Sequence, residues 1–514
     1  MAGVDERWVL RAVDQRALDE RAAASGIEQD ALMESAGTNA AEWILERLRP
    51  RRAVVLAGPG GNGGDALVVA RCLHEAGAEV RSFGLAPLEE CSPATQRMAA
   101  WLEGTGAEPI RPASDDELTE ALDRADCAVD GLFGSGLGRP LSEEAVRIVE
   151  RVNTASAKTV SLDLPSGLAS DRGEMLGDAV RADVTLAMAF LKPAHLFYPA
   201  AGHCGNTAVV DVSYPESVLR TAEPWARVCE RTGIRRRLPV RRPNGHKGTF
   251  GRVLVVAGSI GMTGAAILCC RAAVRAGAGL VHLAGPASLD PIFETTLPEV
   301  ITIPLPDEDG HLANIDDTRL EEAMDRADVL AVGPGLSRAP EALDGVRAMV
   351  ERFPGPIVVD ADGLYALRGC GDVLARLAGR AILTPHPGEL GALVGEASGE
   401  VDAWRRDRAG SYAAEHGIVL VLKGRPTAIG LPDGGVYLNP TGNDGLATGG
   451  SGDVLTGLIA GFAAGGTSLA DAALVATYVH GLAAEVYARD RAPRSLTPSD
   501  VLDLIPEVLR EVER

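Results

Sequence analysis

The sequence lacks an excess of positive charge and lacks any cysteine motif. Its 514 residues carry 50 Lys and Arg against 71 Asp and Glu, which gives a formal net charge of −21. A nucleic-acid-binding face needs a surplus of basic residues, so this balance argues against a nucleic-acid partner and favours small-molecule substrates. The eight cysteines include no CxxC pair and no His/Cys spacing typical of zinc. We therefore expect neither a disulfide framework nor a zinc site.

Signals for export and for a membrane are also lacking. The opening stretch, MAGVDERWVLRAVDQRALDE, is charged from its fifth residue and has no apolar core. We therefore expect no secretory signal peptide and a cytoplasmic location. The uncharged run over 253–270 approaches the length of a bilayer span. Its three spaced glycines, with Ser259 and Thr263, favour a buried strand, a loop and a helix start instead. We expect no membrane partner.

The length and the alternation of elements predict two domains. A chain of 514 residues is too long for one ordinary core. Short β-rich runs alternate with helical stretches, lapse over 213–251 where prolines interrupt a basic run, and then resume. We expect an α/β fold with one domain at 1–220, a basic, proline-containing linker at 221–250 and a second domain at 251–514. A solvated linker is a simpler interpretation of the basic run than an anion-binding site.

The expected elements can be given by residue number. A helix is predicted over 29–48, and a long helical region begins at Gly452. The β-rich runs of the first domain are 53–57, 79–83, 128–133, 159–164, 184–189 and 208–212. Those of the second are 252–257, 279–284, 328–332, 356–360, 381–384 and 418–422, followed by the shorter pair PTAIG and GVYLN.

The first glycine-rich loop, GPGGNGGDA at 58–66, superficially matches the dinucleotide fingerprint GxGxxG. That fingerprint also needs an acid about twenty residues later, at the end of the next strand. No acid follows Val80 where that strand ends. The loop alone is therefore weak support for an ordinary nicotinamide cofactor site. A tight turn with Asp65 at the start of a helix explains it as well.

Two further strand ends carry glycines and polar residues: VDGLFGSGLGRPL at 129–141 and SLDLPSGL at 161–168. The carboxyl ends of parallel strands lie along one crevice. Four polar side chains are therefore expected to converge there: Asn62, Asp130, Asp163 and Ser166. Oxygen ligands with few carboxylates suit a hard, weakly charged cation. Any one of these acids alone would be more typical of a capping group.

These three motifs, in this order, resemble the NAD(P)H-hydrate epimerase family. Its members interconvert the R and S forms of hydrated NADH and NADPH in a Rossmann-like, doubly wound domain with a bound potassium ion. The resemblance implies Asn62, Asp130 and Ser166 as potassium ligands and Asp163 as a substrate contact. It further implies that two loops line the substrate: Gly61, Asn62, Gly63, Gly64 and Asp65, and Gly134, Ser135, Gly136, Leu137, Gly138, Arg139 and Pro140.

The sequence departs from the family loop at Gly61 and Ala66, which replace the usual Asn and Gly. Asn62 and Asp65 remain, so the expected cation site is affected less than the geometry of the loop. Epimerisation requires the ring hydroxyl to leave and water to return on the other face. A carboxylate beside the ring can shuttle the proton, and Asp163 is our candidate for this catalytic role.

The second glycine-rich loop, NPTGNDGLATGGSGDVLTG at 439–457, lacks the Gly-Lys-Ser/Thr ending of a P-loop, which excludes an ATPase of that type. Glycines that run into a helix leave free backbone N–H groups, which suit a transferring phosphoryl group. Asp453 would then lie where it can take the proton from an attacking hydroxyl. Considered alone, GSGD is explained equally well as a helix cap.

Other motifs precede this loop in order: AGSIGMTGAAIL (257–268), GPGL (333–336), VVDADGL (358–364), LTPHPGEL (383–390) and VLKGRPT (421–427). The series resembles the ribokinase-like superfamily, and most closely its ADP-dependent NAD(P)H-hydrate dehydratase branch. The resemblance implies that four residues contact the hydrated nucleotide: Ala265, Gly335, His386 and Asp453. It implies that ADP is held by Lys423, Gly424, Arg425, Pro426, Thr427 and Gly452. Glu389 matches an acid near magnesium-bound water in related kinases.

Together the two resemblances imply a fused isomerase and lyase that repairs hydrated NADH and NADPH. Asp453 would help the ring hydroxyl take phosphate from ADP, and elimination would give NAD(P)H, AMP and phosphate. The expected cofactors are potassium and magnesium ions, with ADP as phosphoryl donor, and we expect a homo-oligomer. Two alternatives stay open here. One is a ribokinase-like kinase for a small alcohol, regulated by the N-terminal half. The other makes the N-terminal half a non-catalytic ligand-binding module.

Overall fold

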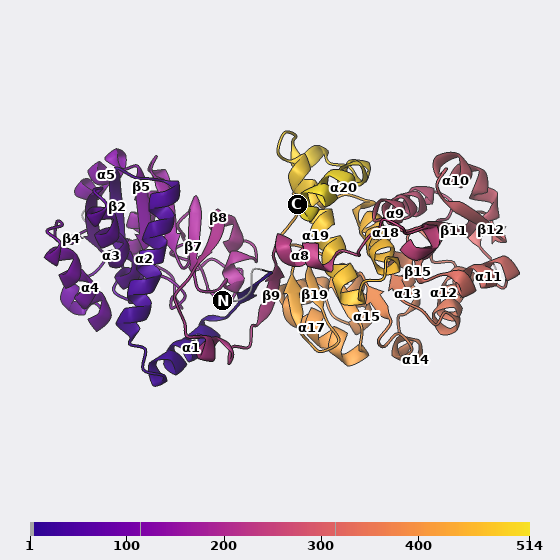
Figure 1. Cartoon of the computed structure of the whole chain (residues 1–514), viewed down its shortest axis with the longest axis horizontal. Coiled ribbons are helices and arrows are strands. Elements are labelled where there is room, and N and C mark those ends of the chain that lie inside the picture. The colour runs from indigo at the N-terminus through magenta and orange to yellow at the C-terminus, as the bar shows by residue number, and fades with distance from the viewer. Residues whose placement is uncertain (1–4, 114, 314) are drawn as a thin grey trace. The chain divides into compact units, whose positions relative to one another are not determined.

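The computed structural model describes residues 5–113, 115–313 and 315–514. The chain divides into two compact units, Arg7–Trp225 and Ala226–Arg514, and Asp5 and Glu6 belong to the second unit. The colours of Figure 1 follow the chain through the first unit from indigo to magenta and through the second to yellow. Each unit is built around its own sheet.

The first unit contains a seven-stranded sheet in the order β4-β3-β2-β5-β6-β7-β8, and every pair in it is parallel. The strands are β2 (Arg52–Ala57), β3 (Glu79–Gly84), β4 (Arg111–Pro112), β5 (Cys127–Gly131), β6 (Lys158–Leu162), β7 (Val184–Met188) and β8 (Asn206–Val210). The chain runs outward from β2 to β4 and then returns to β5. The strand order therefore reverses between β2 and β5, where open α/β sheets bind ligands.

Helices cover this sheet: α1 (Ala12–Ala24), α2 (Gln29–Arg47), α3 (Gly61–Glu75), α4 (Pro93–Gly104), α5 (Asp115–Arg124), α6 (Glu143–Thr154) and α7 (Glu216–Leu219). The expected helix at 29–48 is confirmed by α2, which buries Leu32, Ala36, Ala40 and Ile44 at helical spacing. α2 and α3 pack side by side (Figure 1). A Cβ on Gly37 would overlap Val68, so glycine permits this close approach.

The second unit contains an eleven-stranded sheet in the order β1-β9-β20-β19-β18-β17-β16-β15-β10-β11-β12. Its strands are β1 (Glu6–Val9, of which Glu6 belongs to this unit), β9 (Ala226–Cys229), β10 (Arg252–Val256), β11 (Leu280–Pro286), β12 (Ile301–Leu305), β15 (Val329–Val332), β16 (Ile357–Val359), β17 (Ala381–Leu383), β18 (Val419–Leu422), β19 (Ala428–Gly430) and β20 (Val436–Leu438). β13 (Asp307–Glu308) and β14 (His311–Leu312) form a separate hairpin. β18, β19 and β20 pair antiparallel, whereas the strands from β18 to β12 are parallel. Here the strand order reverses between β10 and β15.

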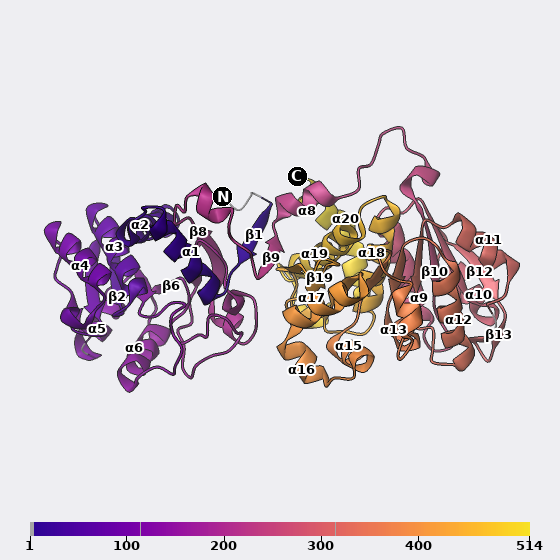
Figure 2. The ribbon, with the colours of Figure 1, turned by 90° about the horizontal axis from the view of Figure 1, so that it is seen from below.

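The helices of this unit are α8 (Arg231–Arg237), α9 (Thr263–Arg275), α10 (Asp290–Thr296), α11 (Thr318–Arg326), α12 (Pro340–Arg352), α13 (Ala361–Ala366), α14 (Gly371–Ala375), α15 (Pro387–Val394), α16 (Ser398–Ala403), α17 (Arg405–His416), α18 (Ser451–Ala464), α19 (Leu469–Tyr487) and α20 (Pro498–Glu513). α18 packs against both α9 and α19 (Figure 2). A Cβ on Gly457 would overlap the carbonyl of Cys269, so this glycine lets α9 and α18 approach closely.

The uncharged run at 253–270 forms β10, a loop and the first part of α9, as expected. Within the described residues, α19 is the helix long and apolar enough to cross a membrane, and 78% of its apolar stretch is buried inside the protein. That burial is typical of a core helix.

Residues 221–250, expected as a linker, include a strand and a helix of the second unit. The division between the units falls after Trp225, and residues 226–229 form β9 beside β20. Arg237 of α8 lies 2.5 Å from Glu6 and 3.0 Å from Asp471. The basic run thus forms ion pairs within the second unit. Four strand residues next to a basic helix are too few to show alternation in the sequence.

Candidate functional sites

A cavity of about 1040 Å³ opens where the strand order of the first unit reverses. Loops after β2, β5 and β6 form one wall, and α1 and α2 form the other. The predicted residues that line it are Gly61, Asn62, Asp65, Gly134, Ser135, Gly136, Leu137, Gly138, Arg139 and Asp163. Gly63, Gly64 and Pro140 do not line it. Gly63 and Gly64 are buried, and a Cβ on either would overlap Gly58 or Met33.

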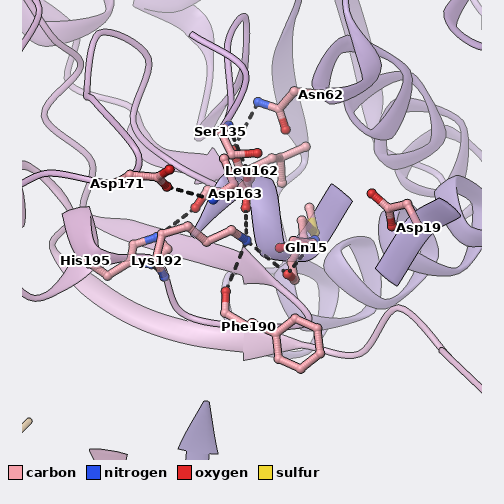
Figure 3. Close-up of polar contacts among 12 residues, drawn as sticks. Gln15, Asp19, Asn62, Ser135, Leu162, Asp163, Asp171, Phe190, Lys192 and His195 are labelled. Carbon is pink, nitrogen blue, oxygen red and sulfur yellow. Dashed lines mark hydrogen bonds and ion pairs between the residues drawn. The ribbon is translucent and has the colours of Figure 1, made fainter. Parts of the chain in front are cut away.

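Asp163 directly follows β6, and its carboxylate is held on both oxygens (Figure 3). Lys192 Nζ donates to Oδ1 at 2.6 Å, and the backbone N–H of Ser135 donates to Oδ2 at 3.0 Å. Burial alone would raise the pKa of Asp163, but the Lys192 ammonium outweighs it and lowers that pKa below the ordinary value. Asp163 therefore faces the cavity as an ionised acceptor.

Two residues that the sequence analysis missed, Lys192 and His195, lie directly behind Asp163 (Figure 3). They belong to the stretch LKPAHL after β7, in which Pro193–His195 forms a short 3-10 turn. Burial and then the Lys192 charge lower the pKa of His195 to about 4, so this ring is neutral. The available signal was a lone lysine in the loop after the buried strand β7, and such a lysine is usually solvated.

The residues implied for potassium fit a cation unequally. The Asn62 amide nitrogen donates to the Leu162 carbonyl at 3.1 Å, while its Oδ1 is buried with no hydrogen-bond partner among the described residues. A buried oxygen without a donor suits a cation ligand. Asp130 differs, because its two oxygens already accept bonds from Ser161, Ser166 and Leu132. The described residues contain no cluster of three or more His, Cys, Asp and Glu side chains suited to a metal.

Two further carboxyls line the same cavity, Asp65 on α3 and Asp19 on α1. Burial, and next the Asp163 charge, raise the pKa of Asp65 well above its ordinary value. Burial also raises the pKa of Asp19, whose carboxylate accepts a hydrogen bond from the Tyr214 hydroxyl. The cavity thus combines one ionised carboxylate with carboxyls that favour the neutral form, as acid and base catalysis requires. Asp19 was not predicted as a site residue, because it lies on a helix without a motif.

In the second unit, the predicted motifs follow neighbouring parallel strands and so meet at one edge of the sheet. Ser259 follows β10, Gly335 follows β15, and Lys423 follows β18. Gly335 has φ +58°, and a Cβ there would come within 2.9 Å of the Ala265 Cβ. The Ser259 hydroxyl donates to the Gly335 carbonyl at 2.9 Å. The structure therefore brings Ala265 and Gly335 together beside the first turn of α9.

Asp453 lies in the first turn of α18, whose N-cap Gly450 has φ +96° and provides no side-chain cap. Burial and then the Asp360 carboxylate raise the pKa of Asp453 to about 7. Lys423 Nζ pairs with Asp360 at 2.9 Å, and the Thr456 hydroxyl donates to the other oxygen of Asp360 at 2.8 Å. A Cβ on Gly452 would lie 3.3 Å from Lys423 Nζ, so the lysine faces the start of α18.

His386 and Glu389 cap the start of α15. His386 Nδ1 accepts from the N–H groups of Gly388 and Glu389 at 3.0 and 3.2 Å, which leaves its exposed Nε2 to carry the proton. Glu389 accepts from the His386 N–H at 2.8 Å and lies 3.7 Å from Lys423 Nζ. Glu389 thus joins the Lys423 cluster, and both of these contacts are made by the same oxygen, Oε2.

The segment expected to hold ADP, Lys423 to Thr427, connects β18 to β19 and lies over a buried arginine. Arg405 Nη1 donates to the Lys423 carbonyl at 2.6 Å, and its guanidinium also pairs with Asp402. A Cβ on Gly424 would overlap this guanidinium. Thr427 closes the segment by donating from its hydroxyl to the Gly424 carbonyl at 2.9 Å. Arg405, like Asp360, was not identified from the sequence.

Comparison with known proteins agrees with this division of the chain. Residues 29–194 match the family described as YjeF-related protein N-terminus, and residues 253–507 match the NAD(P)H-hydrate dehydratase family. A bifunctional NAD(P)H-hydrate repair enzyme from Moorella thermoacetica is 39% identical over 98% of this chain and 97% of its own length. One from Thermofilum pendens is 37% identical over 98% and 96%.

Among solved structures, ADP/ATP-dependent NAD(P)H-hydrate dehydratase from Bacillus subtilis, co-crystallised with ATP and Mg²⁺, is 33% identical. The match covers 55% of this chain and 98% of that one, with a TM-score of 0.47.

Two α/β units, each with carboxylates where its strand order reverses, define a two-domain enzyme with a Rossmann-like and a ribokinase-like part. The chain belongs to the family of bifunctional NAD(P)H-hydrate repair enzymes. Membership disfavours the alternative of a small-alcohol kinase with a non-catalytic N-terminal domain.

Proposed function

We propose that the first unit epimerises hydrated NADH and NADPH and that the second dehydrates the S form, converting ADP to AMP and phosphate. The observation that carries this proposal is a carboxylate at each site. Asp163 follows β6 and lines the cavity of the first unit, and Asp453 lies in the first turn of α18 in the second unit. Family membership and the resemblance of the motifs support the substrate and the donor.

In the first unit, epimerisation requires the ring carbon–oxygen bond to break as the ring nitrogen donates its electron pair. The leaving hydroxyl takes a proton, and water then adds to the opposite face and loses one. Asp163 is ionised and takes the proton from the incoming water, while neutral Asp65 donates to the leaving hydroxyl. Asn62, with Asp130 and Ser166, would hold a potassium ion that supplies a fixed positive charge beside the substrate loop.

In the second unit, the ring hydroxyl attacks the terminal phosphorus of ADP, and the bond from that phosphorus to the AMP oxygen breaks. Asp453 takes the hydroxyl proton. Lys423 and the uncapped N–H groups of α18 stabilise the phosphoryl charge. The ring nitrogen then expels phosphate, and loss of a proton from the neighbouring carbon restores the dihydropyridine. Glu389 would hold water on a magnesium ion, which neutralises phosphate charge.

The activity test supplies hydrated NADH as a mixed epimer pool with ADP and magnesium and follows the absorbance of NADH. We expect full recovery of NADH. Recovery that stops at the S fraction would contradict the epimerase assignment, and no recovery would contradict the dehydratase assignment. Protein-free reactions correct for spontaneous interconversion of the epimers.

Variants separate the two sites. Asp453→Asn is expected to slow dehydration by roughly 10²- to 10⁴-fold, the usual contribution of a general base, and to leave epimerisation unchanged. Asp163→Asn is expected to do the reverse. Asp490→Asn and Asp123→Asn, at exposed positions of the second and first units, are the matched controls. Loss of both activities in either active-site variant would contradict two independent sites.

A further inference from the structure

A completely buried lysine lies behind the cavity of the first unit. The Lys192 side chain is 0% exposed, and it does not line the cavity. Its ammonium donates to Asp163 Oδ1 at 2.6 Å, to the Phe190 carbonyl at 3.1 Å and to the Met188 carbonyl at 3.2 Å (Figure 3). An ammonium has three N–H donors, so all of them are used. Lys192 can therefore act on the substrate only through Asp163.

The backbone of Asp163 is held from the same side. Asp163 has φ +61°, a left-handed conformation that costs free energy at a non-glycine residue. His195 Nε2 donates to the Asp163 carbonyl at 2.7 Å, and the Lys192 N–H donates to His195 Nδ1 at 2.8 Å. The second bond fixes the ring tautomer that the first bond needs. One short turn thus holds both the side chain and the main chain of Asp163.

The other cavity carboxyls have no such support. Within the described part of the chain, Asp19 and Asp65 form no ion pair, although both line the same cavity. Without Lys192, Asp163 would be a third buried carboxyl among acids, and burial disfavours its charged form. The buried Lys192 ammonium therefore distinguishes Asp163 from Asp19 and Asp65.

We propose that Lys192 is a positioning residue of the epimerase site: it holds Asp163, rather than Asp65 or Asp19, as the base and, with His195, sets its direction. This inference rests on the proposed epimerase function of the first unit. It assigns Lys192 no contact with substrate, and so predicts an effect on turnover without an effect on substrate affinity.

The test compares Lys192→Gln with the matched control Lys158→Gln. Lys158 lies in the same unit and pairs with Asp183 at 2.7 Å, but its side chain is 64% exposed. Ion pairs between exposed side chains contribute little to the free energy of unfolding. We expect Lys192→Gln to lower kcat for epimerisation at least tenfold with KM changed less than twofold, and Lys158→Gln to change neither. A Lys192→Gln kcat within twofold of the parent would contradict the proposal.

A double-mutant cycle separates positioning from a general structural role. If Lys192 acts through Asp163, the double variant Asp163→Asn/Lys192→Gln is as slow as Asp163→Asn alone. If Lys192 had a purely structural role, Lys192→Gln would slow the Asp163→Asn variant by the same factor by which it slows the parent protein. That result would overturn the proposal. The double variant carries no unpaired buried charge. Cooperative unfolding of the first unit, followed by circular dichroism, reports whether each variant is folded, and the dehydratase activity of the second unit measures the amount of intact chain.

A measurement on the unaltered protein covers the case in which Lys192→Gln does not fold. Carboxyl ¹³C resonances, assigned with Asp163→Asn and Asp65→Asn, report which acid is ionised. As the pH is raised from the acidic side, we expect Asp163 to ionise at a lower pH than Asp65, and the opposite order would overturn the proposal. A wrong assignment of Asp163 as the epimerase base would give a different result. In that case Asp163→Asn would epimerise at the parent rate, with or without the Lys192→Gln substitution.

Discussion

At the scale of single residues, the two proposed catalytic acids show how the surroundings of an aspartate set its role. Asp163 and Asp453 are both largely removed from water, which favours the neutral carboxyl. Asp163 has its own buried ammonium, and its pKa is lowered. Asp453 shares Lys423 with Asp360 and Glu389, and burial together with these acids raises its pKa to about 7. The proposed bases of the two units are therefore deprotonated over different pH ranges.

This difference predicts distinct pH profiles. Asp453 acts as a base only when it is deprotonated, so kcat/KM for dehydration should fall as the pH drops below about 7. The pKa of Asp163 is lowered, so epimerisation should show no acidic limb near this pH. Initial rates of both reactions, measured on one preparation between pH 5.5 and 8.5, check the prediction. A dehydration profile that is flat down to pH 5.5 would contradict it.

At the scale of elements, the sequence predicted most strands because buried parallel strands are continuous apolar runs between glycine-rich turns. β1, β4, β9, β12, β13 and β14 escaped prediction, and of these β4, β13 and β14 have only two residues each. The motif residues at strand ends were predictable because parallel topology brings such ends together. Lys192 and Arg405 were not predictable as site residues. Each is buried beneath a loop, and the burial depends on how that loop folds, which the local sequence does not show.

The loop between β18 and β19 gives an element-scale prediction. Arg405 supports this loop through the Lys423 carbonyl and lies against Gly424. Losing a hydrogen bond from a charged group costs roughly 1.5–3 kcal/mol, or about tenfold or more in affinity. Arg405→Gln should therefore raise KM for ADP on the order of tenfold with kcat little changed. Steady-state kinetics with varied ADP check this.

The matched control for Arg405→Gln is Arg376→Gln, a substitution of an exposed arginine that pairs with Glu351 at 3.8 Å. It should leave KM for ADP unchanged. A fall in kcat at unchanged KM for Arg405→Gln would show that the arginine supports the reacting groups instead of the nucleotide loop.

At the scale of the whole molecule, each unit has its own sheet, its own core and its own site at a reversal of strand order. Each site is proposed to have a distinct activity, so the two activities report separately on the integrity of the two units. The boundary between them was the least predictable feature. Asp5 and Glu6 belong to the second unit although they precede the first in sequence, and no local pattern reveals such a long-range assignment.

Glu6 gives the prediction at this scale. Its Oε1 accepts from Arg237 Nη2 at 2.5 Å and from the Tyr437 hydroxyl at 2.9 Å, and its side chain is 21% exposed. Glu6→Gln removes a charge that α8 and β20 share, at a cost of about 1–3 kcal/mol in the free energy of unfolding of the second unit. Dehydratase activity should therefore be lost at a lower temperature than in the parent protein, while epimerase activity is lost at the same temperature as in the parent.

The matched control is Glu322→Gln, which alters an exposed pair with Arg326 in the same unit and should shift neither inactivation temperature. Equal loss of both activities on heating Glu6→Gln would mean that Glu6 stabilises the chain as one cooperative body.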